Sequence, residues 1–263
     1  MGVRRLDRGG GKMPRRLPIA IRPSCHSIHN VRARPCPSVF VRRFEYPKLI
    51  RRTQAGTVGR MPNVPLSDAL RGVVCEKLFE ALAGIMAPSI HHAAAINTIG
   101  CYLLCHLTGD DYEVTAGSVV VRQGGAPLAL RADASRIEDH EYYLWIERRD
   151  AGGRVELVDF AARCWRDWAR EVNVLWLGPA PDAVWTFVDA LDGAVAQYAP
   201  DGKITNMVRT GLHHAFRSPN PPEQVARWES AINTALDRLA HDPRALAYMV
   251  ERGIAAPAGP PDR

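Results

Sequence analysis

The strongest constraint on the fold of this chain is the segment Tyr142–Ala162, which reads YYLWIERRDAGGRVELVDFAA. Two largely apolar runs, 141–148 and 154–159, flank a turn with two adjacent glycines. Glycine supplies the positive backbone angles that tight hairpins need. The segment therefore predicts a β-hairpin whose second strand ends on the carboxylate of Asp159.

Two helices and a strand are predicted before the hairpin. Ser67 can cap a helix that runs to about Leu82, with apolar residues at helical spacing. A second helix covers about His92–Leu107 and ends before Gly109. A strand then follows over Glu113–Arg122. A helix followed by a mostly antiparallel sheet, with further helices appended, predicts an α+β fold.

The chain after the hairpin is predicted to be mainly helical. Ala183–Tyr198 carries apolar residues at helical spacing, and we interpret 200–202 (Pro-Asp-Gly) as the break that ends this helix. Pro222 opens another helix, and Asp242 begins a short third one. Three tryptophans that follow the hairpin are expected to pack against the sheet: Trp165, Trp168 and Trp176.

Positive charge is concentrated at the N-terminus. Residues 1–60 hold 15 Lys and Arg against two acidic residues, whereas the rest of the chain holds 19 basic and 26 acidic residues. The leader mixes Arg with Pro, Gly and Ser, and we expect it to be disordered. Our favoured interpretation is an over-long start assignment before Met61; the alternatives are a targeting segment and a nucleic-acid or membrane-surface arm.

These boundaries predict four parts. They are the basic, Arg/Pro-rich leader 1–60, an α+β core over 61–178, a helical extension over 179–254 that packs on the core, and a disordered tail over 255–263. No window approaches about 18 uninterrupted apolar residues, so no membrane span is expected. The six cysteines lack CxxC spacing, which indicates reduced thiols and a cytoplasmic protein.

Three short motifs resemble one protein family. His92–Gly100 reads HAAAINTIG, Tyr143–Glu147 reads YLWIE, and Leu157–Ala162 reads LVDFAA. Their order and spacing resemble the bacterial domain of unknown function 2026 family, in the papain-like and transglutaminase-like cysteine peptidase superfamily. The resemblance covers about residues 87–162. It implies a papain-like core with a Cys-His-Asp triad.

The resemblance fails at two of the three triad positions. Ala93 and its alanine neighbours stand where the family has Cys, and Tyr143 stands where it has His. A tyrosine with a pKa near 10 exchanges protons poorly at neutral pH. Asp159 is retained, and we expect it to accept hydrogen bonds from Tyr143 or Asn97. Asn97 and Trp145 are predicted to line the former cleft.

Three functions remain open. The leading hypothesis is a catalytically degenerate protein, a pseudoenzyme, that binds a peptide or protein in the former active-site cleft. The second is an active thiol hydrolase or acyltransferase that uses Cys101 or Cys105 with His140 and Asp159. The third is a structural interaction protein whose helical tail mediates assembly. For the folded core we expect no nucleic-acid or membrane partner, and the sequence does not predict an oligomeric state.

Cofactor motifs are absent from the sequence. Gly124-Gly125 lacks the spacing of dinucleotide or nucleoside-triphosphate loops, so no cofactor is predicted. The adjacent pairs His91-His92 and His213-His214 lack a supporting HxxxH or carboxylate pattern. We therefore predict no metal site, and we expect Cys101 and Cys105, which share a helix face, to act as buried packing residues.

Overall fold

The computed structural model describes residues 66–123, 126–130, 142–193 and 195–252. The chain divides into two units, Met1–Thr57 and Val58–Arg263, and every described residue belongs to the second. The predicted leader and C-terminal tail lie outside the described residues. Within these ranges the protein has the predicted α+β fold, with helices beside an antiparallel sheet.

The first two helices begin and end close to the predicted residues. Helix α1 covers Asp68–Leu82, and the Ser67 side chain accepts a hydrogen bond from the backbone N–H of Leu70 as its N-cap. Helix α2 covers Ala93–Thr108 and follows a short 3₁₀ turn, η1 (Ile90–His92). Gly109 ends α2 in the left-handed conformation that glycine adopts without strain.

The predicted hairpin is present. Strand β3 covers Tyr143–Arg149 and strand β4 covers Val155–Asp159, and the two pair antiparallel. Gly153 in the connecting turn has a φ of 80°, which explains why glycine stands there. After β4 the chain continues as the 3₁₀ helix η3 (Phe160–Cys164) and the short helix α3 (Trp165–Glu171).

A six-stranded sheet is built around the hairpin. The strand order is β2-β1-β3-β4-β5, β6 pairs with β1, and all five pairings are antiparallel. The four remaining strands are β1 (Glu113–Val121), β2 (Leu128–Leu130), β5 (Val184–Phe187) and β6 (Ala196–Pro200). Gly117 in β1 is opposite both Tyr143 and Pro200, so this residue joins the β3 and β6 pairings.

The prediction of one helix over Ala183–Tyr198 is wrong. This segment forms β5, the 3₁₀ turn η4 (Val188–Ala190) and β6. β5 pairs with β4, and β6 pairs with β1, so pairing with the sheet overrides the helical spacing of the apolar residues. The residues Val184-Trp185-Thr186-Phe187 are β-branched and aromatic types that favour strands.

The predicted helical extension over 179–254 also contains β5 and β6, which belong to the sheet. Three helices follow these strands. They are α4 (Gly202–Arg217), α5 (Glu223–Ala240) and α6 (Pro243–Glu251). Helix α4 was not predicted, because Asp201-Gly202 was interpreted only as a break. Asp201 is instead the N-cap of α4 and accepts hydrogen bonds from the N–H groups of Lys203 and Ile204.

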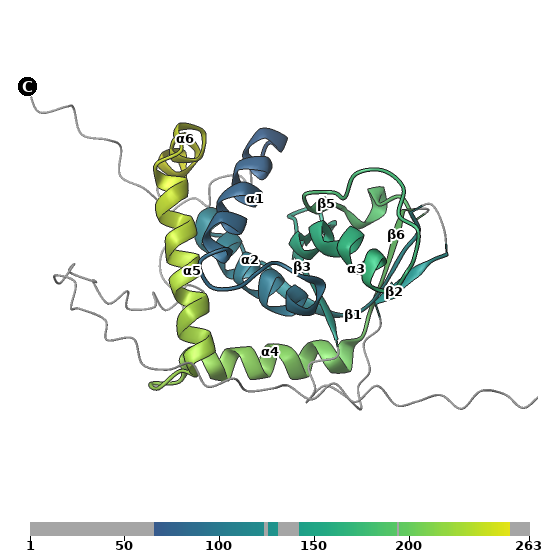
Figure 1. Ribbon diagram of the computed structural model, residues 1–263. Helices are drawn as coiled ribbons and strands as arrows, with labels where there is room; N and C mark the ends of the chain where they lie inside the picture. The colour runs from purple at the N-terminus through teal and green to yellow at the C-terminus, as the bar shows by residue number, and fades with distance from the viewer. Residues whose placement is uncertain (1–65, 124–125, 131–141, 194, 253–263) are drawn as a thin grey trace, which may run out of the picture. The chain divides into compact units, whose positions relative to one another are not determined.

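The extension packs on the rest of the described unit. Helix α5 lies along both α1 and α2, and α4 lies against β1 (Figure 1). Apolar side chains of α5, including Ile232, Ala235 and Leu239, join the same hydrophobic core as those of α1 and α2. None of the described helices is both long enough and apolar enough to cross a membrane.

A group of buried charges connects the end of α2 and the β3–β4 hairpin to the residue that follows α6. Arg148 in β3 forms ion pairs with Asp110 and, at 2.8 Å, with Glu156. The Tyr112 hydroxyl also donates to Glu156, at 3.0 Å. Arg252, which follows α6, donates to the Thr108 carbonyl at 2.6 Å and lies 3.4 Å from Asp110. Buried charges of this kind are stable only when they are paired.

Candidate functional site

The centre of the site is the carboxylate of Asp159, the last residue of β4. It is fully buried. Oδ1 accepts a hydrogen bond from the Asn97 amide at 2.9 Å. Oδ2 accepts two, from the Tyr143 hydroxyl at 2.8 Å and from the Tyr198 hydroxyl at 2.9 Å. The expected bonds from Tyr143 and Asn97 are therefore both confirmed, and Tyr198 adds a third donor.

Asn97 fixes helix α2 against the hairpin. Its amide nitrogen also donates to the Leu144 carbonyl at 2.7 Å, and its Oδ1 accepts from the backbone N–H of Phe160 at 2.8 Å. Both functions of the amide are thus used, and the side chain has no solvent exposure. A buried amide with every partner in place orients its element strongly.

A glycine on the next turn of α2 permits this approach. A Cβ atom at Gly100 would lie well under 3.0 Å from the Phe160 ring, a distance that real Cβ atoms do not reach. Phe160 directly follows Asp159 and is fully buried. The small residue at position 100 therefore lets α2 come close enough for Asn97 to reach the carboxylate.

Tyr143 connects the carboxylate to a tryptophan. Its hydroxyl accepts a hydrogen bond from the Trp165 indole N–H at 3.0 Å while it donates to Asp159. Burial and the charge of Asp159 raise the pKa of Tyr143 well above its ordinary value. The phenol therefore stays protonated at neutral pH and acts as a donor rather than a base.

Tyr198 was not recognised from the sequence, because the segment around it was predicted to be helical. In the structure it lies in β6, opposite Val119 of β1. Its ring meets the Trp145 ring edge to face, with 5.3 Å between the centroids. The segment AQYAP, which ends before Asp201, could have been interpreted as a strand. That interpretation would have placed the Tyr198 hydroxyl at the sheet.

We call Asn97, Tyr143, Asp159, Trp165 and Tyr198 the Asp159 cluster. Burial raises the pKa of Asp159 to about 6, although the hydrogen bonds from Asn97, Tyr143 and Tyr198 act in the opposite direction. The carboxylate is thus buried and held by donors on both oxygens. Such a group can bind a proton, and the five residues of the cluster include neither a thiol nor an imidazole.

Two of the three positions that the resemblance assigns to a triad, Tyr143 and Asp159, belong to this cluster and are in direct contact. The third, Ala93, is the first residue of α2, one turn before Asn97, and is buried. The correspondence of these positions to a triad stays a prediction.

The residues that were predicted to line a cleft lie in the core. Asn97 and Trp145 are both fully buried. The Trp145 indole N–H donates to Glu147 at 2.7 Å. Two surface depressions, of about 370 and 460 Å³, lie at other places on the described residues, and neither is lined by the Asp159 cluster.

The alternative thiol site is only partly described. Cys101 and Cys105 both donate to the Tyr112 carbonyl, at 3.4 and 3.3 Å, so they do share a helix face. Neither makes a hydrogen bond to Asp159 among those of the described residues. His140 lies outside these residues, so its proposed role with Cys101 stays a prediction.

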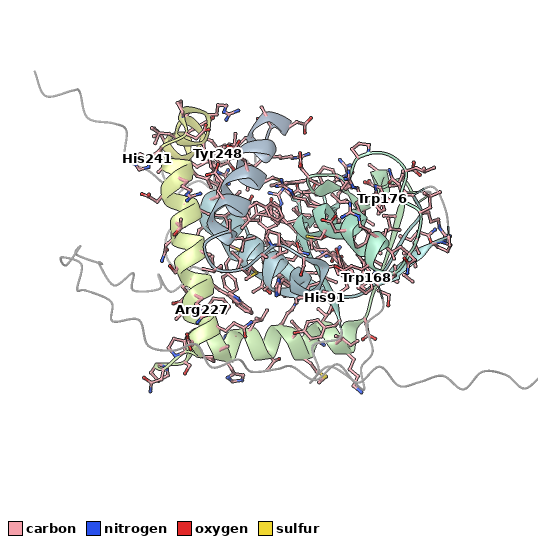
Figure 2. All side chains as sticks on the ribbon, in the orientation of Figure 1. His91, Trp168, Trp176, Arg227, His241 and Tyr248 are labelled. Carbon is pink, nitrogen blue, oxygen red and sulfur yellow. The ribbon has the colours of Figure 1, made fainter. Side chains whose placement is uncertain are left out.

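The paired histidines are engaged in local contacts. His91 lies 3.1 Å from a Glu171 carboxylate oxygen and meets the Trp168 ring edge to face; Figure 2 shows His91 and Trp168 side by side. His92 contacts the Ala87 carbonyl at 2.9 Å. Within the described ranges, no group of three or more His, Cys, Asp or Glu side chains is arranged to hold a metal ion.

The fold and this cluster define an α+β protein with a buried aspartate held by two tyrosines. No family model matches the chain. No curated protein matches it either. One solved structure, described as the crystal structure of a genomics target, is similar over 67% of this chain and 81% of its own, at 15% sequence identity and a TM-score of 0.42.

Proposed function

We propose that this chain is a catalytically inactive protein of papain-like or transglutaminase-like fold, related to the domain of unknown function 2026 family, that acts in the cytoplasm by binding a peptide or protein. One observation carries the proposal. The retained acid, Asp159, is bound by Tyr143 at the position of the missing histidine, and Ala93 begins the helix that should carry the thiol. The fold elements of a triad are kept, and the reacting groups are absent.

The Asp159 cluster is buried apart from Tyr198, which is half-buried, so we consider the surface beside the cluster. The segment after α3 exposes three apolar side chains: Val172 at 39%, Leu175 at 62% and Leu177 at 53%. Helix α3 packs on η1, the turn that leads into Ala93. Exposed apolar side chains that gather in one segment are typical of binding surfaces. We therefore assign peptide or protein binding to residues 172–177.

A binding selection tests this assignment. Displayed random peptides are selected on the full chain, and the recovered peptides are measured by fluorescence anisotropy. Leu175→Asp and Leu177→Asp should each weaken binding at least about tenfold, because a charge replaces apolar contact area. Met207→Asp, at another exposed apolar residue on α4, is the matched control and should bind normally. Equal loss in all three variants would contradict the assignment.

A thiol-labelling experiment tests the absence of catalysis. Iodoacetamide labelling of each cysteine is followed by mass spectrometry from pH 5 to 9. The pKa values of Cys75, Cys101 and Cys164 are raised, so these thiols should react slowly near neutral pH. Selective labelling of Cys101 near pH 7, lost in Asp159→Ala, would instead support the thiol enzyme and overturn the proposal.

A further inference from the structure

Cys101 and Cys105 form a pair of thiols outside the Asp159 cluster. They lie one turn apart on α2, and both donate to one atom, the carbonyl oxygen of Tyr112. Two sulfur atoms that contact the same oxygen atom point toward the same spot. The other two described cysteines, Cys75 and Cys164, lie on different elements. The pair on α2 is thus a preformed dithiol.

The helix geometry disfavours a disulfide between these thiols. Residues four apart on a helix have Cβ atoms about 5–6 Å apart, whereas a disulfide needs about 3.5–4.5 Å. Helix α2 is continuous over Ala93–Thr108, so a disulfide requires it to distort. An ion held between the sulfur atoms lengthens the bridge by two metal–sulfur bonds of about 2.3 Å each, so it does not need the short Cβ–Cβ distance of a disulfide.

The number and type of ligands select the ion. Thiolates are soft ligands that favour Cu(I), whereas a structural zinc site takes four ligands. Among the described residues, no further His, Cys, Asp or Glu completes a site of three or more ligands here. Two thiolates alone suit an ion that accepts two-coordinate geometry.

We propose that Cys101 and Cys105 form a two-coordinate binding site for a soft monovalent cation of the Cu(I) class. Binding forms two copper–sulfur bonds, breaks the two S–H bonds and releases both protons to solvent. The product is a bis-thiolate complex with a net charge of −1. Copper keeps its oxidation state, so the step needs no oxidant or reductant. The site is independent of the proposed peptide binding.

The surroundings provide an entry route. Cys101 is buried, whereas Cys105 is half-buried, so the ion reaches the pair from the Cys105 side. The Arg209 guanidinium, which donates to the Val114 carbonyl at 2.7 Å, forms an ion pair with Glu113.

The test is an anaerobic titration with Cu(I) buffered by bathocuproine disulfonate. The protein is the full chain with Cys25→Ser and Cys36→Ser, which removes the two leader thiols. We expect one ion per chain, release of two protons per ion, and an X-ray absorption spectrum with two sulfur neighbours. In this background, Cys101→Ser and Cys105→Ser should each lose the ion, and Cys75→Ala should retain it.

Three results would each overturn the site. They are no Cu(I) binding by the background chain, retention of the ion in either serine variant, and a spectrum with three or more ligands. Circular dichroism checks that each variant is folded. If Cys101→Ser does not fold, loss or retention of Cu(I) by Cys105→Ala tests the site. Truncation of Cys105 should disturb the core less, because its side chain is only half-buried.

Discussion

Gly100 of α2 lies directly against the ring of Phe160, so that a Cβ atom at position 100 would be well under 3.0 Å from a ring carbon. The contact sets how closely the helix approaches the end of β4. Because Asn97 and Asp159 lie one turn and one residue away from this contact, their hydrogen bond depends on it. A glycine without catalytic chemistry thus determines the geometry of the Asp159 cluster.

Gly100→Ala should destabilise the protein. Overpacking of a close-packed core costs about 1–3 kcal/mol, which exceeds the gain in helix propensity of up to about 1 kcal/mol. Gly72→Ala in α1 is the matched control, because a Cβ atom there meets nothing within 4 Å. Urea denaturation should show lower stability for the first variant and equal or higher stability for the second. The reverse order would show that α2 can shift away from Phe160.

Tyr143→Phe and Tyr198→Phe should each lower the free energy of unfolding by about 1–3 kcal/mol. Each change removes a hydroxyl that donates to a buried carboxylate, and it leaves less compensation for the charge. The pKa of Asp159 should then rise further above its value of about 6. Carbon-13 NMR of the Asp159 carboxyl group measures this pKa.

Tyr248→Phe is the control for both variants. The Tyr248 hydroxyl is buried but has no hydrogen-bond partner among the described residues. Its removal should leave stability unchanged or slightly higher, because no bond is lost. If all three variants lose equal stability, the hydrogen bonds to Asp159 would not be the cause of the loss.

Asp159 should make stability depend on pH. Its folded pKa of about 6 lies above its ordinary value of 3.8, so the folded state binds the proton more tightly. This contribution is fully present below about pH 4 and is lost as the pH rises to about 6. The shift corresponds to on the order of 3 kcal/mol. Other groups cancel in the difference between the natural chain and Asp159→Asn, measured by denaturation at each pH.

That difference should fall between about pH 4 and 6 and stay constant above about pH 7. A flat difference across the whole range would show that the donors around Asp159 fully compensate its burial. Hydrogen bonds from Arg244 lower the pKa of the half-buried Asp242 to about 2. It therefore does not titrate in the same pH window.

Ala93→Cys combined with Tyr143→His should create a reactive thiol. The introduced thiol lies at the start of α2, where the helix dipole favours a thiolate, and the imidazole lies next to Asp159. Alkylation at position 93 should be faster at neutral pH in the double variant than in Ala93→Cys alone. Equal rates would contradict the proposed correspondence of these positions to a catalytic triad.

Arg148→Met should be the most destabilising of these changes. It leaves Glu156, which is 1% exposed, and Asp110 with only their longer contacts to Arg71 and Arg252, both at 3.4 Å. Removing one member of a buried ion pair costs about 3–5 kcal/mol. Arg170→Met, which breaks an exposed pair with Asp167, should cost less than about 1 kcal/mol. Thermal unfolding compares the two variants.

Local signals were enough to predict the first half of the described unit. The Ser67 cap, the Gly109 stop and the glycine turn of the hairpin each act within a few residues, so the sequence alone carries them. The contacts of Asp159 with Tyr143 and Asn97 were also predicted, because the resemblance of the three motifs to a cysteine peptidase family implies that these residues lie together.

The second half depends on contacts that the sequence does not display. A helical period fits Val184, Phe187 and Val188. The segment nevertheless forms strands, because β5 pairs with β4 and β6 pairs with β1. The same error concealed Tyr198, whose role exists only once β6 is paired. Asp201 was interpreted as a terminator, because an aspartate before glycine suits a turn as well as a helix N-cap.

The contact between Arg252 and Thr108 spans 144 residues of sequence. Synthesis proceeds from the N-terminus at about 5–20 residues per second, so the Thr108 carbonyl at the end of α2 is made roughly 7–29 seconds before the Arg252 guanidinium. During that interval, the nascent chain presents the faces of α1 and α2 that α5 later covers. The core of this protein is therefore completed only when the last helices have been synthesised. Truncations within α6 should increase the dependence of folding on chaperones.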